Sequence, residues 1–245
     1  MTKQHYFKTT ILCATLAATG LLTACFHDDD NDDDMETPKL SYQITVSNLT
    51  NGQAFTPPAV ILHDGDYHAW HAGMTASTGL EKLAEGGDVS EFLDMAAASS
   101  HVSATMASAN GPFGPGASET LTVMVAQSDK LRLSLATMLA NTNDAFTGIS
   151  EADIGELAVG ESMVVMAPAY DAGTEANTEA SGTIPGPADT TVGGGEGYNA
   201  ATETGRVVTI HPGIVSMDDG LSTSILSEAH RWQNPVAKIT IERLQ

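Results

Sequence analysis

The chain has 245 residues, enough for one large domain or two small ones. It carries 31 acidic side chains against 10 lysines and arginines, which gives a formal net charge of −21. This excess argues against nucleic acid as a partner, because phosphate binding needs a basic face. It also disfavours direct attraction to anionic lipid and makes divalent cations natural counterions.

Residues 1–24 are predicted to be a lipoprotein signal peptide. Two lysines give a basic start, and residues 9–22 form an apolar run without charge, which is the layout of a secretory signal. The run is too short for a comfortable membrane span, which needs about 20 apolar residues. The sequence LTAC that ends at Cys25 resembles the bacterial lipobox, and this resemblance implies that Cys25 is acylated and becomes the new N-terminus.

The residues around the cleavage point predict a location in the cell envelope. Phe26 follows the cysteine, whereas lipoproteins kept at the inner membrane usually have Asp there. The resemblance therefore implies an outer-membrane lipoprotein that faces either the periplasm or the cell surface. Residues 25–39 include the run DDDNDDD, which repels itself and predicts an acidic, extended tether. Cys13 leaves with the signal, so the exported domain has no internal disulfide and depends on its core, or on core plus metal.

Residues 40–245 mainly show strand patterns. Apolar and polar residues alternate, as in half-buried strands, most clearly at residues 42–47, 120–125, 130–135 and 237–242. Apolar runs at residues 59–62, 163–166 and 206–210 predict further strands.

Two short helices are predicted between these strands. Residues 76–85 form the first, with Ser77 as its N-cap and Leu80, Leu83 and Ala84 on one face. Residues 89–98 form the second, with Asp88 as N-cap and Glu91 completing a capping box.

Two acidic turns follow strand-like runs. NTNDAFTG occupies residues 141–148, and YDAGTE occupies residues 170–175. Residues 149–160 are predicted to be a polar excursion. Residues 171–198 lack periodicity, and a loop of that length is usually functional or mobile.

Strands and helices do not alternate along the chain, so the sequence does not predict a parallel sheet. The pattern predicts an all-β fold, an antiparallel β-sandwich with Greek-key connections, about eight strands and one or two short helices inserted. No linker interrupts residues 40–245, so they are predicted to form one domain.

Six segments together resemble the spondin N-terminal domain, the module of F-spondin and mindin. They are YQITVSNLTNGQAFTPP, HDGDYHAW, ASTGLEKLAEGGD, SLATMLANTNDAFTG, YDAGTE and NPVAKITIERL. The resemblance covers residues 41–245 and implies a C2-like sandwich in an extracellular setting, with a calcium ion between loops at one end.

The same resemblance implies the metal ligands. Asp144 matches the acid of the family's P-D-W-F segment, and Asp171 matches the first acid of its Y-D-A-G-T-[DE] segment. Glu119 is the nearest match to a further family Glu on a preceding strand. Ala145 replaces the family's Trp, and the disulfide cysteines of the animal members are absent. Calcium takes six to eight hard oxygens, and its expected role here is structural, ordering loops.

A second cluster allows a different chemistry. His63, Asp66, His68 and His71 lie close in sequence, and imidazole suits zinc or copper. They define the alternative of a metal-dependent hydrolase, although no H-E-x-x-H motif is present. Structural or surface histidines are the simpler interpretation.

The sequence therefore predicts a lipid-anchored, calcium-binding spondin module without catalysis. The membrane is contacted through the lipid anchor. The expected ligand is extracellular matrix, a glycan or a cell-surface protein, and no nucleic acid is expected.

Overall fold

Ten strands, paired antiparallel into two sheets, form the framework of the described chain. The computed structural model describes residues 39–245 except Asp129 and residues 191–194. The predicted signal peptide, Cys25 and all but the last residue of the predicted tether lie outside the described residues. None of the described helices is long and apolar enough to cross a membrane.

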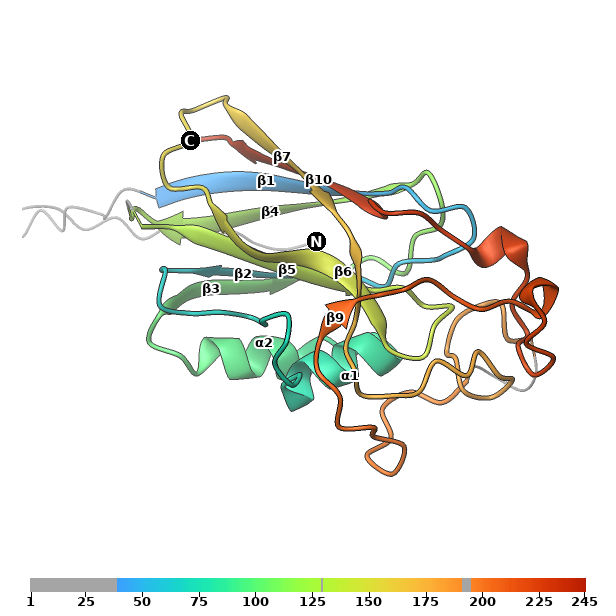
Figure 1. The fold of residues 1–245 in the computed structure, drawn as a ribbon. Helices are drawn as coiled ribbons and strands as arrows, with labels where there is room; N and C mark the ends of the chain where they lie inside the picture. Colours follow the sequence, from blue (N-terminus) through green and yellow to red (C-terminus); the bar gives the residue numbers. More distant parts are fainter. Residues whose placement is uncertain (1–38, 129, 191–194) are drawn as a thin grey trace, which may run out of the picture. The chain divides into compact units, whose positions relative to one another are not determined.

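The smaller sheet joins the two ends of the described chain (Figure 1). In spatial order its strands are β4 (Ser118–Ala126), β1 (Lys39–Asn48), β10 (Ala237–Arg243) and β7 (Ser162–Ala167). β1 and β10 pair in its centre, with Ile44 opposite Ile241. Burial alternates strictly along β4, because one face of this sheet packs on the core and the other faces solvent.

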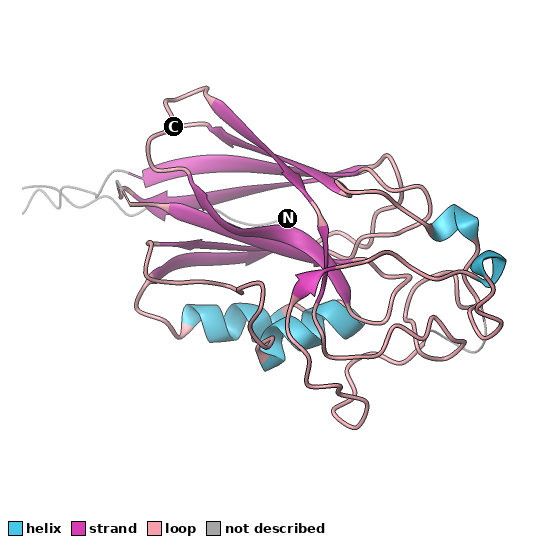
Figure 2. Cartoon of the chain, in the orientation of Figure 1, coloured by secondary structure: helices cyan, strands magenta, loops and turns pink. Residues whose placement is uncertain are grey.

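The larger sheet has six strands and is covered on both faces. In spatial order its strands are β3 (Val102–Ala107), β2 (Ala59–His63), β5 (Arg132–Met138), β6 (Ala145–Asp153), β8 (Ala169–Asp171) and β9 (Thr209–Ile210). All of β2 and nearly all of β5 are buried. The smaller sheet covers one face, and two helices cover the other (Figure 2). The predicted all-β antiparallel sandwich is thereby confirmed.

The helices begin close to the predicted positions. α1 (Thr78–Gly86) is capped by Ser77, whose Oγ accepts from the N–H of Leu80 at 3.2 Å, as predicted. α2 (Ser90–Ala97) has Val89 at its N-cap, so the prediction of Asp88 as the N-cap was wrong. Asp88 nevertheless accepts from the Ser90 N–H at 2.9 Å, one position earlier than a capping box requires.

Three strands were not predicted, and one was predicted too long. β6 occupies the end of the predicted NTNDAFTG turn and the start of the predicted polar excursion, because pairing with β5 and β8 supplies its hydrogen bonds and burial hides its small polar residues. β3 and β8 were also missed. The predicted strand at residues 206–210 is reduced to Thr209–Ile210.

The long loop after β8 contains little regular structure. Apart from an isolated bridge between Ala180 and Ser224, its described residues pair with no strand until β9. Two short 3-10 helices, η1 (Met217–Asp219) and η2 (Glu228–His230), follow β9. The loop instead binds the two acidic turns through side-chain and backbone hydrogen bonds.

Candidate functional site

Asp144 lies at the start of β6, with its side chain fully buried. Its Oδ2 accepts hydrogen bonds from the backbone N–H groups of Thr174 at 2.8 Å and Glu175 at 3.0 Å. The preceding turn is fixed by the Thr142 hydroxyl, which donates to the Leu139 carbonyl and accepts from the Ala145 N–H. The carboxylate of Asp144 therefore holds the YDAGTE loop.

Asp171 ends β8 and lies beside Asp144. β8 pairs with β6 so that Asp171 is opposite Ala145, and the Ala172 N–H donates to the Asp144 carbonyl at 3.1 Å. The Asp171 carboxylate accepts from the Gly173 N–H and from the Asn177 amide, each at 2.8 Å. The structure thus brings together the two acidic turns that follow strand-like runs in the sequence. We call Asp144 and Asp171 the acid pair.

One oxygen of the acid pair has no partner. Asp144 Oδ1 is buried and forms no hydrogen bond within the described chain. Burial, and then the nearby charge of Asp171, raises the pKa of Asp144 to about 6. Buried polar atoms are nearly always hydrogen-bonded, so this oxygen calls for a partner such as an ion or water.

Among residues that the structure describes, no ion pair neutralises the acid pair. The ion pairs found among the described residues do not include Asp144 or Asp171. His211 lies near Asp171, but burial lowers the pKa of His211 to about 4, so its imidazole is neutral at pH 7. Its Nδ1 accepts from the Gly213 N–H at 3.0 Å, and its buried Nε2 has no partner in the described chain.

Two further carboxylates adjoin the acid pair. Glu85 is fully buried, and the Thr174 hydroxyl lies within hydrogen-bonding reach of both Glu85 and Asp144. Burial, with the charges of Glu175 and Asp144, raises the pKa of Glu85 to about 7. Glu175 accepts from the Thr202 hydroxyl at 2.8 Å and the Asn143 amide at 3.4 Å. Neither acid was predicted, although Glu175 is the last residue of YDAGTE.

A small cavity opens next to the acid pair. Its volume is about 200 Å³, and it is lined by hydroxyl, amide and carboxylate side chains that include Asn143, Glu175, Thr178, Thr183 and Thr202. Asn143 and Glu175 are the chain neighbours of Asp144 and Thr174, so the cavity lies one residue away from the acid pair along the chain.

Glu119 is not brought to the acid pair. It lies on β4, in the other sheet, where its Oε1 accepts from the Ser108 hydroxyl at 2.5 Å and the Asn110 amide at 2.8 Å. Among the described residues, Asp64, Asp66 and His101 offer ligand atoms that lie within 4.8 Å of one another, whereas Glu119 forms no such group with the acid pair. The loop after β3 folds over Glu119 and satisfies it locally.

Replacing Glu119 by Gln is expected to leave any calcium response unchanged. The amide oxygen of Gln can still accept from Ser108 and Asn110, so the free energy of unfolding should fall by no more than about 1 kcal/mol. Thermal unfolding of Glu119→Gln in calcium and in chelator checks this. Loss of a response that the wild type shows would instead restore Glu119 as a ligand.

The histidines of the alternative prediction do not converge on one point. His63 is buried, with Nδ1 2.5 Å from the Asp64 carbonyl and Nε2 2.9 Å from the Ser134 hydroxyl. His68 pairs with Glu151 at 3.2 Å, and its ring lies 4.5 Å from that of His71. Both ring nitrogens of His63 are thus engaged within the fold.

Another buried acid belongs to the long loop. Glu179 accepts from the Val215 N–H at 3.2 Å through Oε1, while its buried Oε2 has no partner in the described chain. Burial raises the pKa of Glu179 to about 7. A carboxyl whose pKa is raised on folding stabilises the fold fully below its unfolded pKa, and this contribution is lost as the pH rises through the folded pKa.

Glu179→Gln should therefore be more stable than the wild type at pH 8, by about 1–3 kcal/mol. At pH 4 to 5 the two should differ little, because Glu179 is then largely protonated in the folded state. Urea unfolding at both pH values measures the difference. An equal effect of the substitution at both pH values would contradict the raised pKa.

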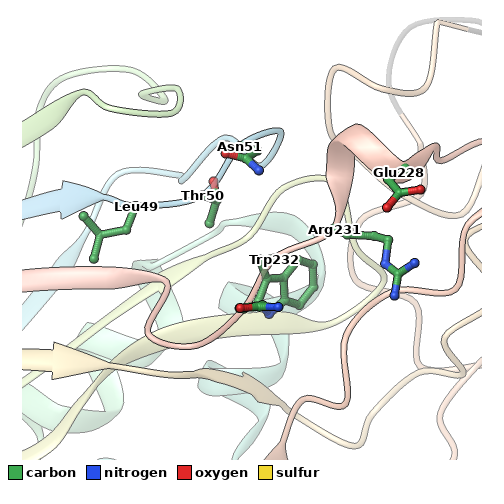
Figure 3. A pocket seen from close by; sticks show the side chains of 7 residues that line it. Leu49, Thr50, Asn51, Glu228, Arg231 and Trp232 are labelled. Atoms are coloured by element: carbon green, nitrogen blue, oxygen red, sulfur yellow. The ribbon is translucent and has the colours of Figure 1, made fainter.

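A larger cavity lies beside η2 (Figure 3). Its volume is about 490 Å³, within the range typical of small-molecule sites. Its lining residues are Leu49, Thr50, Asn51, Glu228, Arg231, Trp232 and Gln233. The indole of Trp232 is half-buried against His211, with ring centroids 5.1 Å apart.

The fold and its paired acidic loops define a class: β-sandwich modules that carry their function on loops held by a rigid scaffold. Residues 49–191 match the family model described as Spondin_N. The match covers more than half of the chain, which therefore belongs to the spondin N-terminal domain family and is a spondin-like binding module. Comparison with curated proteins gives no match.

Proposed function

We propose that this spondin module binds calcium at the acid pair and serves adhesion at the cell envelope, where a lipid on Cys25 anchors it. The observation that carries the proposal is the buried, unpartnered Oδ1 of Asp144 beside the carboxylate of Asp171. Two carboxylates that no ion pair of the described residues neutralises suit a divalent cation, which would neutralise both.

The chemistry of the surrounding groups favours calcium. Calcium takes carboxylate, carbonyl, amide and water oxygens in flexible geometry. Asp144 Oδ2 is already engaged by two N–H groups, so Oδ1 is the oxygen free to bind an ion. Asp171 would supply the second carboxylate, and main-chain oxygens of the two turns with water would complete the shell.

The proposed role of the ion is structural. It would join the NTNDAFTG and YDAGTE turns in a domain predicted to have no disulfide. We propose no catalytic step, since the histidines of the hydrolase alternative are engaged in separate contacts.

Among the predicted partners, the cavity beside η2 favours a glycan. The indole of Trp232 offers an apolar surface on which a sugar ring can stack, and Asn51, Glu228 and Gln233 offer polar groups around it. Within the described chain, no hydrogen bond engages these three side chains. We propose this cavity as the contact with an extracellular or cell-surface glycan.

Thermal unfolding of the full chain, in calcium and in chelator, tests the metal site. Calcium at 100 times its Kd should stabilise the fold by about 2.7 kcal/mol, which raises the Tm by about 5–10 °C for a domain of this size. Asp171→Asn, which keeps the shape of the side chain, should lose most of that shift. Equal Tm values for the wild type in both buffers would refute the calcium site.

The anchor and location have a separate test. Cys25→Ser should abolish incorporation of labelled palmitate and release the protein from the outer-membrane fraction. Unchanged fractionation of Cys25→Ser would contradict the lipid anchor without affecting the calcium proposal.

A further inference from the structure

A second group of acids lies on α1. Glu81 and Glu85 are four residues apart, so they share one face of the helix. This face is covered, and the exposed fractions are 6% for Glu81 and 0% for Glu85. Each side chain has a buried Oε1 that finds no partner in the described chain.

The segment from residue 195 to 204 lies across this face of α1. The Asn199 N–H donates to Glu85 Oε2 at 3.2 Å. The exposed carboxyl group of Glu203 lies close to that of Glu81, and after burial its proximity raises the pKa of Glu81. The backbones also approach closely, because a Cβ on Gly86 would lie 3.5 Å from the Cα of Gly197. A carboxyl–carboxyl contact thus joins the loop to the helix.

No positive side chain neutralises this group. Lys82 is the nearest cation, but its ammonium pairs with Glu91 and lies 5.1 Å from the centroid of the Tyr198 ring. The ion pairs of the described residues do not include Glu81, Glu85 or Glu203. Two acids in contact can stay together only if they share a proton or hold a cation.

We propose that Glu81 and Glu203, with Glu85 one helical turn away, bind a second divalent cation that clamps residues 195–204 onto α1. Two carboxylates with water and carbonyl oxygens are an ordinary ligand set for calcium or magnesium. The site adjoins the acid pair, because the Thr174 hydroxyl lies within reach of both Glu85 and Asp144, but its proposed ligands are different carboxylates. The acids that act on Glu81 are Glu203 and Glu85, whereas Asp171 is the acid that acts on Asp144.

Ion counting tests the proposal. The full chain is dialysed at pH 7.5 against excess calcium, and bound calcium per chain is measured. We expect two ions for the wild type and one each for Glu81→Gln and Asp144→Asn. Asp94→Asn is the matched control on the exposed face of α2, and it should keep two.

The possible failures are distinguishable. If Glu81→Gln binds as many ions as the wild type, the second site is refuted, and the acid pair stands if Asp144→Asn loses an ion. If only Glu81→Gln loses an ion, the second site stands and the first is refuted. No bound ion in the wild type refutes both.

Thermal unfolding gives an independent test, because the difference in Tm between Glu81→Gln and the wild type should change sign between chelator and calcium. In chelator, the amide introduced by Glu81→Gln can donate to Glu203 and relieve the repulsion, so the Tm of this variant should exceed that of the wild type. In calcium the order should reverse, because the wild type alone gains the second ion. A higher Tm for the variant in both buffers would mean that the two acids share only a proton.

Discussion

Replacing Asp144 by alanine is expected to lower the free energy of unfolding by about 3–5 kcal/mol, even in chelator. The substitution removes the acceptor for the N–H groups of Thr174 and Glu175. Each buried donor left without a partner costs about 1–3 kcal/mol. The YDAGTE loop would lose its hydrogen bonds to this side chain and keep only its backbone pairing with β6. Urea unfolding at constant m-value measures this loss.

Asp144→Asn separates the two roles of this side chain. The amide oxygen can still accept from the YDAGTE loop, and the negative charge beside Asp171 is gone. In chelator we therefore expect Asp144→Asn to be far more stable than Asp144→Ala. In calcium, both variants should lack the stabilisation that the wild type gains. Wild-type stability of Asp144→Ala in chelator would show that the hydrogen bonds of Asp144 contribute little.

Phe146→Ala is the second substitution with a large expected effect, about 3–5 kcal/mol. Phe146 is fully buried between the larger sheet and the helices. Its ring meets Trp70 edge-on at 5.2 Å and stacks on Tyr170 at 5.3 Å. Such aromatic pairs contribute about 0.5–1.5 kcal/mol beyond the area they bury. Loss of the Phe146 ring would weaken the packing of β6 against β8, and these two strands position the acid pair.

Two controls accompany Phe146→Ala. Phe146→Leu keeps most of the volume and should cost clearly less than the alanine variant. Met124→Ala removes a side chain that is 63% exposed on the outer face of β4, and it should change stability by no more than about 0.5 kcal/mol. A loss below about 1 kcal/mol for Phe146→Ala would contradict its place in the core.

Periodicity predicted the parts of the fold whose two faces differ. β4 alternates because water lies on one side, and Leu121, Val123 and Val125 show it directly. The same rule failed for β6, where Thr147 and Gly148 are buried between covered faces. Hydrogen bonds to both neighbouring strands, not apolar side chains, define that strand.

The two aspartates could be predicted because each lies in an acidic turn that follows a strand-like run and matches a segment of the family. Glu119 could not be placed, since its partners Ser108 and Asn110 depend on how a loop folds back over β4. Glu81 and Glu85 were missed for a similar reason. Acids four residues apart on a helix are typical of a solvated face, and it is the distant segment at residues 195–204 that covers them.

The most direct test of the account is an anomalous difference map from crystals grown in calcium. We expect a peak about 2.3–2.6 Å from Asp144 Oδ1, with a carboxylate oxygen of Asp171 in the same coordination shell. An empty or water-filled position beside Asp144 Oδ1 in crystals grown at saturating calcium would contradict the proposed function.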